Sequence, residues 1–252
     1  MKPITGIVIT LNEAAMIAGC LQSLRRVCDE IIVVDSLSQD ATREIAAREG
    51  ARVIEQPYLG DGPQKAHAVP LASNDWIFSL DADERLEDDA VTLISQLPLN
   101  DPHLAYAFRR RNLVGNHWIK AAGFYPDSVV RLYNRQRAGY LPKKHHSRVA
   151  APKVRHTKTH LRHFTYENLS HWIRRIDELS AYDAWALKSR GVKPARWRPP
   201  AHALAALLQK LVLKGGMFQG SDGMTVAVTT AFNAYMKYLK LNELYQQEAD
   251  LQ

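Results

Sequence analysis

Short runs of apolar residues alternate with helix-like stretches through the first hundred residues, and this alternation constrains the fold more than any other feature of the sequence. The runs cover residues 4–10, 31–34, 52–54 and 76–80. Branched and aromatic runs bounded by turn formers are typical of buried strands. Strands that alternate with helices at this spacing predict βαβ units and a parallel sheet. With 46% hydrophobic residues among 252, the chain can bury a full core.

Polar residues gather where three of these runs end. They are Thr10, Asn12 and Glu13 after the first run, Asp35, Ser36 and Ser38 after the second, and Asp81 and Asp83 after the fourth. Ligands of open α/β sheets bind beyond the carboxyl ends of the strands. Together with a predicted helix that carries Lys65, the three ends therefore predict a nucleotide site. The sequence has neither a Gly-x-Gly-x-x-Gly turn after the first strand nor a Walker Gly-Lys-Ser/Thr motif, which argues against a dinucleotide or P-loop site.

Three acidic residues, Asp81, Asp83 and Glu84, fall within four positions at the end of the fourth run. On an extended chain Asp81 and Asp83 point to the same side, and a divalent cation with oxygen ligands best relieves their repulsion. Glu84 and the acidic residues at 87–89 also suit a solvated turn at the N-terminus of the next helix. The local pattern leaves both interpretations open, a metal site and an acidic helix cap.

The formal net charge of +7 hides a strong asymmetry. Residues 1–100 hold 8 Lys/Arg and 16 Asp/Glu, a net charge of −8, whereas residues 101–214 hold 23 and 6, a net charge of +17. An anionic partner is therefore expected at the middle of the chain. Nucleic acid, a phosphorylated substrate and an anionic membrane surface all suit such a field, and charge alone does not choose between them.

The cysteine content and the N-terminus indicate a protein of the cytoplasm. Cys20 and Cys28 lie in or near one amphipathic helical stretch without metal-ligand partners, so we expect reduced, structural thiols. No apolar signal-peptide core follows Met1-Lys2. No uninterrupted apolar run reaches the roughly 18 residues that a membrane span needs.

Two segments beyond residue 100 carry further candidate functional groups. Residues 105–111 begin as an alternating strand and end in Arg109 to Arg111, which suit either a solvated edge or a rim that contacts phosphate. Asp127 closes a Gly- and Pro-bearing segment before a predicted strand at 128–133, which makes it our candidate general base. The alternatives are Glu84 or a histidine as the base, with Asp127 shaping the loop as an Asx-turn residue.

The C-terminal third is predicted to be helical from residue 166, with apolar residues recurring at intervals of three and four. Residues 190–200 form a basic, Pro-rich linker with Trp197, and apolar helical stretches follow at 203–213 and 224–241. Cationic residues beside tryptophan are typical of an interfacial membrane anchor. The alternative is a helical hairpin that packs on the catalytic domain or on a second copy in a homodimer. We thus expect a domain at 1–165, with a nucleotide-binding half at 1–100 and an acceptor half at 101–165, and a helical region at 166–252.

Several of these segments, in this order, resemble the motifs of family 2 glycosyltransferases with the GT-A fold. They are Ile9-Thr10-Leu11-Asn12-Glu13, Val33-Val34-Asp35-Ser36, Gly62-Pro63-Gln64-Lys65 and Leu80-Asp81-Ala82-Asp83-Glu84. Further segments resemble the bacterial lipopolysaccharide core β-1,4-glucosyltransferase group. They are Gly123-Phe124-Tyr125-Pro126-Asp127, Gly220-Ser221-Asp222-Gly223 and Lys237-Tyr238-Leu239-Lys240-Leu241. The resemblance implies an α/β fold with a mixed, mostly parallel sheet, helices on both faces and a C-terminal helical appendage.

The resemblance also implies roles for individual residues. The donor would be bound by Thr10, Asn12, Glu13, Asp35, Ser36, Lys65 and Asp81. Asp35 would accept from the uracil imide, and Asp83 would coordinate Mg²⁺ or Mn²⁺ on the diphosphate, where the metal neutralises the charge of the leaving group. Arg109 and Arg131 are expected to contact the acceptor or its phosphates.

Histidines supply the third expected metal ligand. Family members commonly carry a His-Glu pair after the strand that follows Asp127, and here the pair is His146-Ser147, so the acid–base role of the lost Glu position has no counterpart. His146 is our first choice of ligand, and His163 in a stretch resembling His-Tyr-x-Tyr is the alternative. The histidines between 145 and 163 match no common zinc-ligand spacing and have no cysteine among them.

We therefore predict an inverting, metal-dependent glycosyltransferase that moves a hexose, with glucose as the first choice, from a UDP-sugar to lipopolysaccharide inner core or another anionic lipid-linked acceptor. It would act at the inner face of the cytoplasmic membrane and bind no nucleic acid. A sugar-1-phosphate nucleotidyltransferase is one alternative, although the first strand lacks its Gly-rich, Arg-containing phosphate loop. A basic nucleic-acid-binding module using Arg109–Arg111 and residues 143–162 is the other, but those runs lack interleaved stacking aromatics.

Overall fold

The computed structural model describes residues 2–142 and 147–250, and the chain forms two compact units. The first unit comprises Met1–Arg111 and Asp127–Phe164, and the second comprises Asn112–Pro126 and Thr165–Gln252. The second unit thus holds a segment, residues 112–126, that we expected in the catalytic domain. It belongs there because Ile119 and Ala122 share a buried apolar cluster with Trp172 and Val226 of the C-terminal helices.

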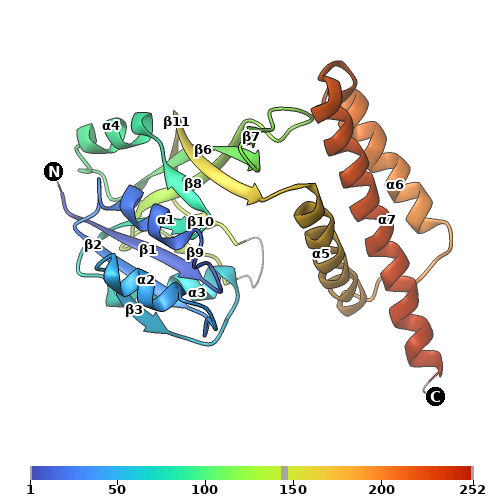
Figure 1. The fold of residues 1–252 in the computed structure, drawn as a ribbon, viewed down its shortest axis with the longest axis horizontal. Coiled ribbons are helices and arrows are strands. Elements are labelled where there is room, and N and C mark those ends of the chain that lie inside the picture. Colours follow the sequence, from blue (N-terminus) through green and yellow to red (C-terminus); the bar gives the residue numbers. More distant parts are fainter. Residues whose placement is uncertain (1, 143–146, 251–252) are drawn as a thin grey trace. The chain divides into compact units, whose positions relative to one another are not determined.

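The first unit is built on one mixed sheet (Figure 1). Its strands are β1 (Ile4–Thr10), β2 (Glu30–Asp35), β3 (Arg52–Glu55), β4 (Trp76–Asp81), β5 (Glu84–Leu86), β6 (Leu104–Val114), β8 (Asp127–Asn134) and β11 (Lys153–Tyr166). Their order is β3-β2-β1-β4-β8-β6-β11-β5. The pairs among β1 to β4 are parallel, whereas β8 runs antiparallel to both β4 and β6. The predicted α/β fold with a mixed sheet is confirmed.

Helices cover both faces of this sheet, and each face has its own apolar core. On one face α1 (Ile17–Leu24), α2 (Thr42–Arg48) and α4 (Asp88–Gln96) pack around Phe78 and Phe108. On the other, α3 (Asp61–Ala68), the 3₁₀ turn η1 (Val69–Leu71) and the hairpin of β9 (Gly139–Tyr140) and β10 (Val149–Ala150) pack around Ile77 and Tyr133. Fully buried strands of this kind explain why the runs of the first hundred residues are continuously apolar.

Two local expectations need correction. Asp127 is the first residue of β8 and does not lie in the preceding loop, because its backbone pairs with Arg110 across the sheet. The basic linker ends before residue 200, since α6 begins at Arg198 with Pro199 and Pro200 in its first turn. Proline is tolerated there because the first N–H groups of a helix have no intrahelical acceptor.

Cys20 and Cys28 are free, and burial raises the pKa of both thiols.

The second unit is mainly helical. Its elements are β7 (His117–Trp118), α5 (Leu169–Ser189), α6 (Arg198–Leu208), the π-helical turn η2 (Gln209–Leu213), the 3₁₀ turn η3 (Gly216–Phe218) and α7 (Gly220–Asp250). Asn168 caps α5 by accepting from the backbone N–H of His171. The long α7 packs against both α5 and α6. In the described part of the chain, no helix combines the length and the apolar character that crossing a bilayer would require.

Candidate active site

The predicted strand ends meet at one edge of the sheet. Thr10 at the end of β1 pairs in register with Asp35 at the end of β2, and Ile9 pairs with Asp81 at the end of β4. Because these strands are parallel, their carboxyl ends lie together, which is the place where such sheets bind ligands. Asp35 and Asp81 therefore lie at a common edge, as a nucleotide site requires.

Asp81 is neutralised by two basic side chains of the protein. Its Oδ1 lies 2.5 Å from Nζ of Lys65 on α3, and its Oδ2 lies 2.6 Å from Nη2 of Arg131 on β8. Burial alone would raise the pKa of Asp81, but Arg131 and Lys65 hold that pKa well below its usual range. The repulsion that the sequence predicts between neighbouring carboxylates is thus relieved at Asp81 by a lysine and an arginine.

The ion pairs continue from Arg131 to the candidate base. Nη2 of Arg131 also lies 2.5 Å from Oε1 of the fully buried Glu84, which is 3.4 Å from Nη1 of Arg110. Arg110 then donates from Nε to Oδ2 of Asp127 over 2.9 Å. Lys65, Asp81, Arg131, Glu84, Arg110 and Asp127 form one chain of alternating charges, which we call the ionic chain. It connects the strand end at β4 to the first residue of β8.

Asp83 faces a different partner. It lies in the two-residue turn between β4 and β5, where its Oδ2 is 3.3 Å from Nε2 of His163 on β11. Burial lowers the pKa of His163, but the Asp83 carboxylate more than offsets this effect, and the pKa is raised overall. The other oxygen, Oδ1, is buried and has no hydrogen-bond partner in the part of the chain that the structure describes. A buried carboxylate oxygen without a partner is costly unless a cation or another ligand approaches it.

The ends of β1 and β2 are joined by hydrogen bonds around Asp35. Its fully buried carboxylate accepts from the backbone N–H of Ser38 over 2.8 Å and from the Ser38 hydroxyl over 2.5 Å. The Ser38 hydroxyl accepts from the backbone N–H of Asn12, whose side-chain oxygen accepts from Gln39. These bonds shape the edge of the nucleotide site, and the contact between Asp35 and uracil stays a prediction.

The remaining predicted site residues differ in what surrounds them. Ser36 accepts from the amide of Gln64 on α3, and the backbone N–H of Glu13 donates to Thr42. The hydroxyl oxygen of Thr10 is buried and has no hydrogen-bond partner among the described residues. His146 lies outside the described residues, as does His145. Of the two histidines predicted as metal ligands, His163 is the one that lies beside Asp83 in the described part of the chain.

The basic residues of the acceptor side are arranged in a way that the sequence did not reveal. Arg131, predicted to touch the acceptor, is only 5% exposed and bridges Asp81 and Glu84. In the run at 109–111, Arg110 reaches Glu84 and Asp127, whereas Arg109 pairs in register with Ser128. The alternation along β6 indicates that neighbouring arginines of this run point to opposite faces of the sheet. Their partners could not be predicted, because they lie on strands that are distant in sequence.

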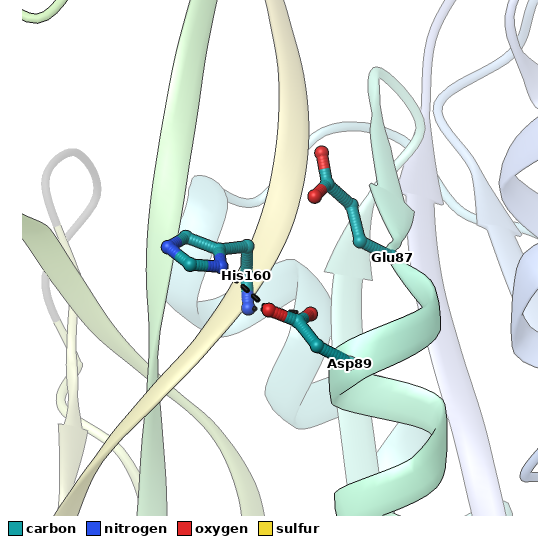
Figure 2. Close-up of side chains that lie close together, drawn as sticks. All are labelled: Glu87, Asp89 and His160. Atoms are coloured by element: carbon teal, nitrogen blue, oxygen red, sulfur yellow. Dashed lines mark hydrogen bonds and ion pairs between the residues drawn. The ribbon is translucent and has the colours of Figure 1, made fainter.

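A second acidic group lies beside α4. Glu87, Asp89 and His160 offer ligand atoms within 4.8 Å of one another (Figure 2). Glu87 already has two cationic partners, because Arg111 lies 2.5 Å and Arg162 3.4 Å from its carboxylate, and His160 Nδ1 lies 2.6 Å from Asp89. A cation would have to displace both arginines, so we assign no metal to this group.

Taken together, the fold and the site are those expected of an enzyme that binds a nucleotide at the edge of a mixed α/β sheet. The sequence model described as Glycosyl transferase family 2 matches residues 5–163. The chain belongs to glycosyl transferase family 2.

Two relatives that cover nearly the whole chain agree with this membership. The chain is 30% identical to an uncharacterized glycosyltransferase of Rickettsia felis, over 96% of this chain and 90% of that protein. It is 28% identical to the lipopolysaccharide core biosynthesis glycosyltransferase LpsC of Rhizobium meliloti, over 98% of this chain and 93% of that protein. A solved structure of glucosyl-3-phosphoglycerate synthase from Mycobacterium tuberculosis, in complex with Mn²⁺, UDP and glucosyl-3-phosphoglycerate, is similar over 45% of each chain, with 26% identity and a TM-score of 0.36.

Proposed function

We propose that this glycosyltransferase is an inverting, metal-dependent hexosyltransferase that uses a UDP-sugar, with glucose as the first choice. The observation that carries the proposal is the unpartnered, buried Oδ1 of Asp83, next to His163 and one turn beyond the strand end at Asp81. Family membership favours this function over a nucleotidyltransferase or a nucleic-acid-binding module.

The residues around Asp83 suit a divalent cation. A carboxylate oxygen is the ligand that Mg²⁺ and Mn²⁺ prefer, and an imidazole nitrogen favours Mn²⁺ of the two. Asp83 and His163 would hold the ion. The metal would neutralise negative charge on the leaving diphosphate, which lowers the barrier to breaking the bond to the sugar. Asp81 would not be a first-choice ligand, since Lys65 and Arg131 already occupy both of its oxygens.

The nucleoside would bind at the ends of β1 and β2. The buried Thr10 hydroxyl, which lacks a hydrogen-bond partner among the described residues, supports a polar contact with the base or ribose there. Asn12, Glu13, Asp35 and Ser36 would complete this pocket as predicted from the family resemblance. Lys65 would act through Asp81, by keeping this carboxylate ionised and oriented toward the ribose.

Asp127 would act as the general base. Arg110 fixes one carboxylate oxygen, which orients the group at the first residue of β8. The acceptor hydroxyl would attack the anomeric carbon and pass its proton to Asp127 while the bond from that carbon to the diphosphate oxygen breaks. The electron pair of the broken bond leaves with UDP. A single displacement of this kind inverts the anomeric configuration and needs no covalent sugar–enzyme intermediate.

The acceptor is proposed to be lipopolysaccharide inner core or another anionic lipid-linked saccharide at the inner face of the cytoplasmic membrane. The net charge of +17 over residues 101–214 supports an anionic acceptor, and the name of the relative LpsC supports lipopolysaccharide core. Arg109 would contact acceptor phosphates. The helical region would associate with the membrane surface or with a second copy of the chain.

The test is thermal unfolding with a panel of UDP-sugars, with and without Mg²⁺ or Mn²⁺. We expect a UDP-hexose to stabilise the wild type only when a metal is present, because a cation held by Asp83 and His163 would neutralise the charge of the diphosphate. Asp83→Ala should abolish the shift. Asp88→Ala is the matched control, since Asp88 is 90% exposed on α4 and pairs with Arg26 at the surface.

Two outcomes would contradict the proposal. A shift that survives in chelator would remove the metal from donor binding. Release of pyrophosphate from UTP and a sugar phosphate, without transfer from the UDP-sugar, would show a nucleotidyltransferase.

A further inference from the structure

The outward side of α6 and η2 is apolar, which is the reverse of what a surface helix normally shows. Exposed apolar positions recur there at intervals of three and four and carry Trp197, Ala201, Leu204, Leu208 and Val212, and the exposed Leu213 follows directly. We call these residues the α6 outer face. Residues at this spacing lie on one side of a helix. The opposite side of α6 packs against α7, which leaves the outer face exposed among the described residues of the unit.

The turn that joins α6 to α7 (Figure 1) carries further exposed apolar residues. Leu213 is 79% exposed and Phe218 is 83% exposed, with Met217 between them in the chain. Scattered exposed apolar residues are ordinary, but a contiguous row marks an interaction surface. The row runs without a charged residue on its exposed side from Trp197 to Leu213.

The exposure of the turn is built into the fold. A Cβ on Gly223 of α7 would lie 2.0 Å from the carbonyl oxygen of Gly216, so only glycine permits this close approach. Gln219 accepts from the backbone N–H of Ala122, and Lys210 donates to the Ala122 carbonyl. The turn is therefore fixed from two sides with Leu213 and Phe218 still outside.

The charge around this surface selects its partner. Residues 190–221 hold six Lys/Arg and no Asp/Glu, with Lys214 directly beside the turn and Arg196 and Arg198 beside Trp197. A second copy placed on the same face would bring like charges together, whereas anionic head groups would be attracted to them. Apolar residues with flanking cations, and a tryptophan at one end, are the features of a helix that lies in the membrane interface.

We propose that the α6 outer face and Phe218 bind the surface of an anionic phospholipid bilayer, with α6 lying in the plane of the interface. The inference rests on the proposed function, for which it names the membrane-binding surface. The sixteen residues from 198 to 213 span about 24 Å as a helix, which is too short to cross the hydrocarbon core but suits an in-plane orientation.

The test is cosedimentation of the full chain with vesicles. Wild type is expected to bind phosphatidylglycerol-containing vesicles at least about tenfold more tightly than phosphatidylcholine vesicles, and to release as salt is raised. Leu204→Ser with Leu208→Ser, and separately Phe218→Ser, should each weaken binding by about tenfold, because each removes apolar area from the interface. The matched control is Leu169→Ser on α5, which removes a leucine that is 54% exposed and should leave binding within about twofold of wild type.

A second measurement guards against variants that fail to fold. In the Phe218→Trp variant, tryptophan emission should shift to the blue on anionic vesicles and be quenched by lipids brominated on the acyl chain. UDP-glucose binding with Mn²⁺ is measured on every variant, so that loss of the donor site is distinguished from loss of the membrane-binding surface.

Three results would overturn the inference. The first is that the wild type stays in the supernatant when anionic vesicles are sedimented, while it still binds UDP-glucose. The second is that the Leu204→Ser, Leu208→Ser variant binds the vesicles as tightly as the wild type. The third is that the wild type dimerises without lipid and becomes monomeric on this double substitution, which would assign the surface to a second copy.

Discussion

The two units depart from the usual distribution of polar and apolar residues in opposite directions. The first unit holds the ionic chain from Lys65 to Asp127, in which Lys65, Glu84 and Arg131 are buried and the other three side chains are partly buried. The second unit exposes a row of apolar side chains on the α6 outer face. Buried ion pairs seldom stabilise a fold more than apolar residues of the same shape would, and an exposed apolar row favours aggregation. Since neither arrangement is favoured for folding alone, both point to binding partners.

The ionic chain and the apolar row also differ in whether their side chains find partners within their own unit. In the first unit each charge of the ionic chain meets an opposite charge of the same unit, and one oxygen of Asp83 has no hydrogen-bond partner among the described residues. In the second unit the apolar row stays at least half exposed from Leu204 to Leu213 at its outward leucines and valine, within the part of the chain that the structure describes. The first arrangement supports the proposed site for a small charged ligand, and the second supports the proposed membrane-binding surface.

The largest expected effect tests whether the ionic chain is a single structure. Arg131→Met removes the cation shared by Asp81 and Glu84 and leaves a fully buried carboxylate at Glu84. We expect the free energy of unfolding in urea to fall by about 3–5 kcal/mol. Arg26→Met, which breaks a surface pair with Asp88, should cost under about 1 kcal/mol. Equal losses in the free energy of unfolding would mean that breaking the ionic chain costs no more than breaking a surface ion pair.

The second prediction separates chemistry from binding at the end of the chain. Asp127→Asn keeps an oxygen that can accept from Arg110 but removes the base. Transfer from UDP-glucose should fall by about 10²-fold or more, with donor affinity retained. Asp101→Asn, at a surface carboxylate, is the control. If turnover of Asp127→Asn matches that of wild type, the base is another group and Asp127 serves only to anchor Arg110.

The third prediction concerns the second unit. Gly223→Ala places a methyl group against the carbonyl oxygen of Gly216, so the turn has to move. We expect a loss of about 1–3 kcal/mol in the free energy of unfolding, measured by chemical denaturation. Gly139→Ala, where a Cβ would meet nothing within 4 Å, should be close to neutral. A neutral Gly223→Ala would show that the exposed turn is not fixed by this contact.

Much of the first unit could be predicted from the sequence, because its signals are local. The strands around Ile7 and Ile32, and the polar ends at Asp35 and Asp81, follow from apolar runs and from the rule that ligands bind at the carboxyl ends of parallel strands. The ionic chain could not be predicted in this way. Glu84 and Arg110 are 26 positions apart and meet only because β8 and β6 pair antiparallel beside β4.

The helical region shows the same division. Its periodic apolar residues predicted helices, but the start of α6 was placed too late because Pro199 and Pro200 were assigned to a linker. Which side of α6 would pack against α7 depends on contacts with a distant helix, so periodicity alone did not show that the outward side was the apolar one. Long-range packing, and not local preference, decides which of two apolar sides is covered.

The smallest expected effect is a pH dependence that connects Asp83 to the fold of the metal-free protein. Because the pKa of His163 is raised in the folded state, the protonated imidazole stabilises the fold. That contribution is fully present below the ordinary histidine pKa of about 6.5 and is lost as the pH rises through the raised value. In chelator, the difference in free energy of unfolding between wild type and His163→Gln should therefore be largest at acidic pH and shrink as the pH is raised. His67→Gln, at an exposed histidine, should show no such trend. A difference that grows with pH would mean that burial lowers the pKa of His163 by more than the Asp83 carboxylate raises it. The site around Asp83 would then not favour a charged partner, and its contrast with the apolar α6 outer face would be weakened.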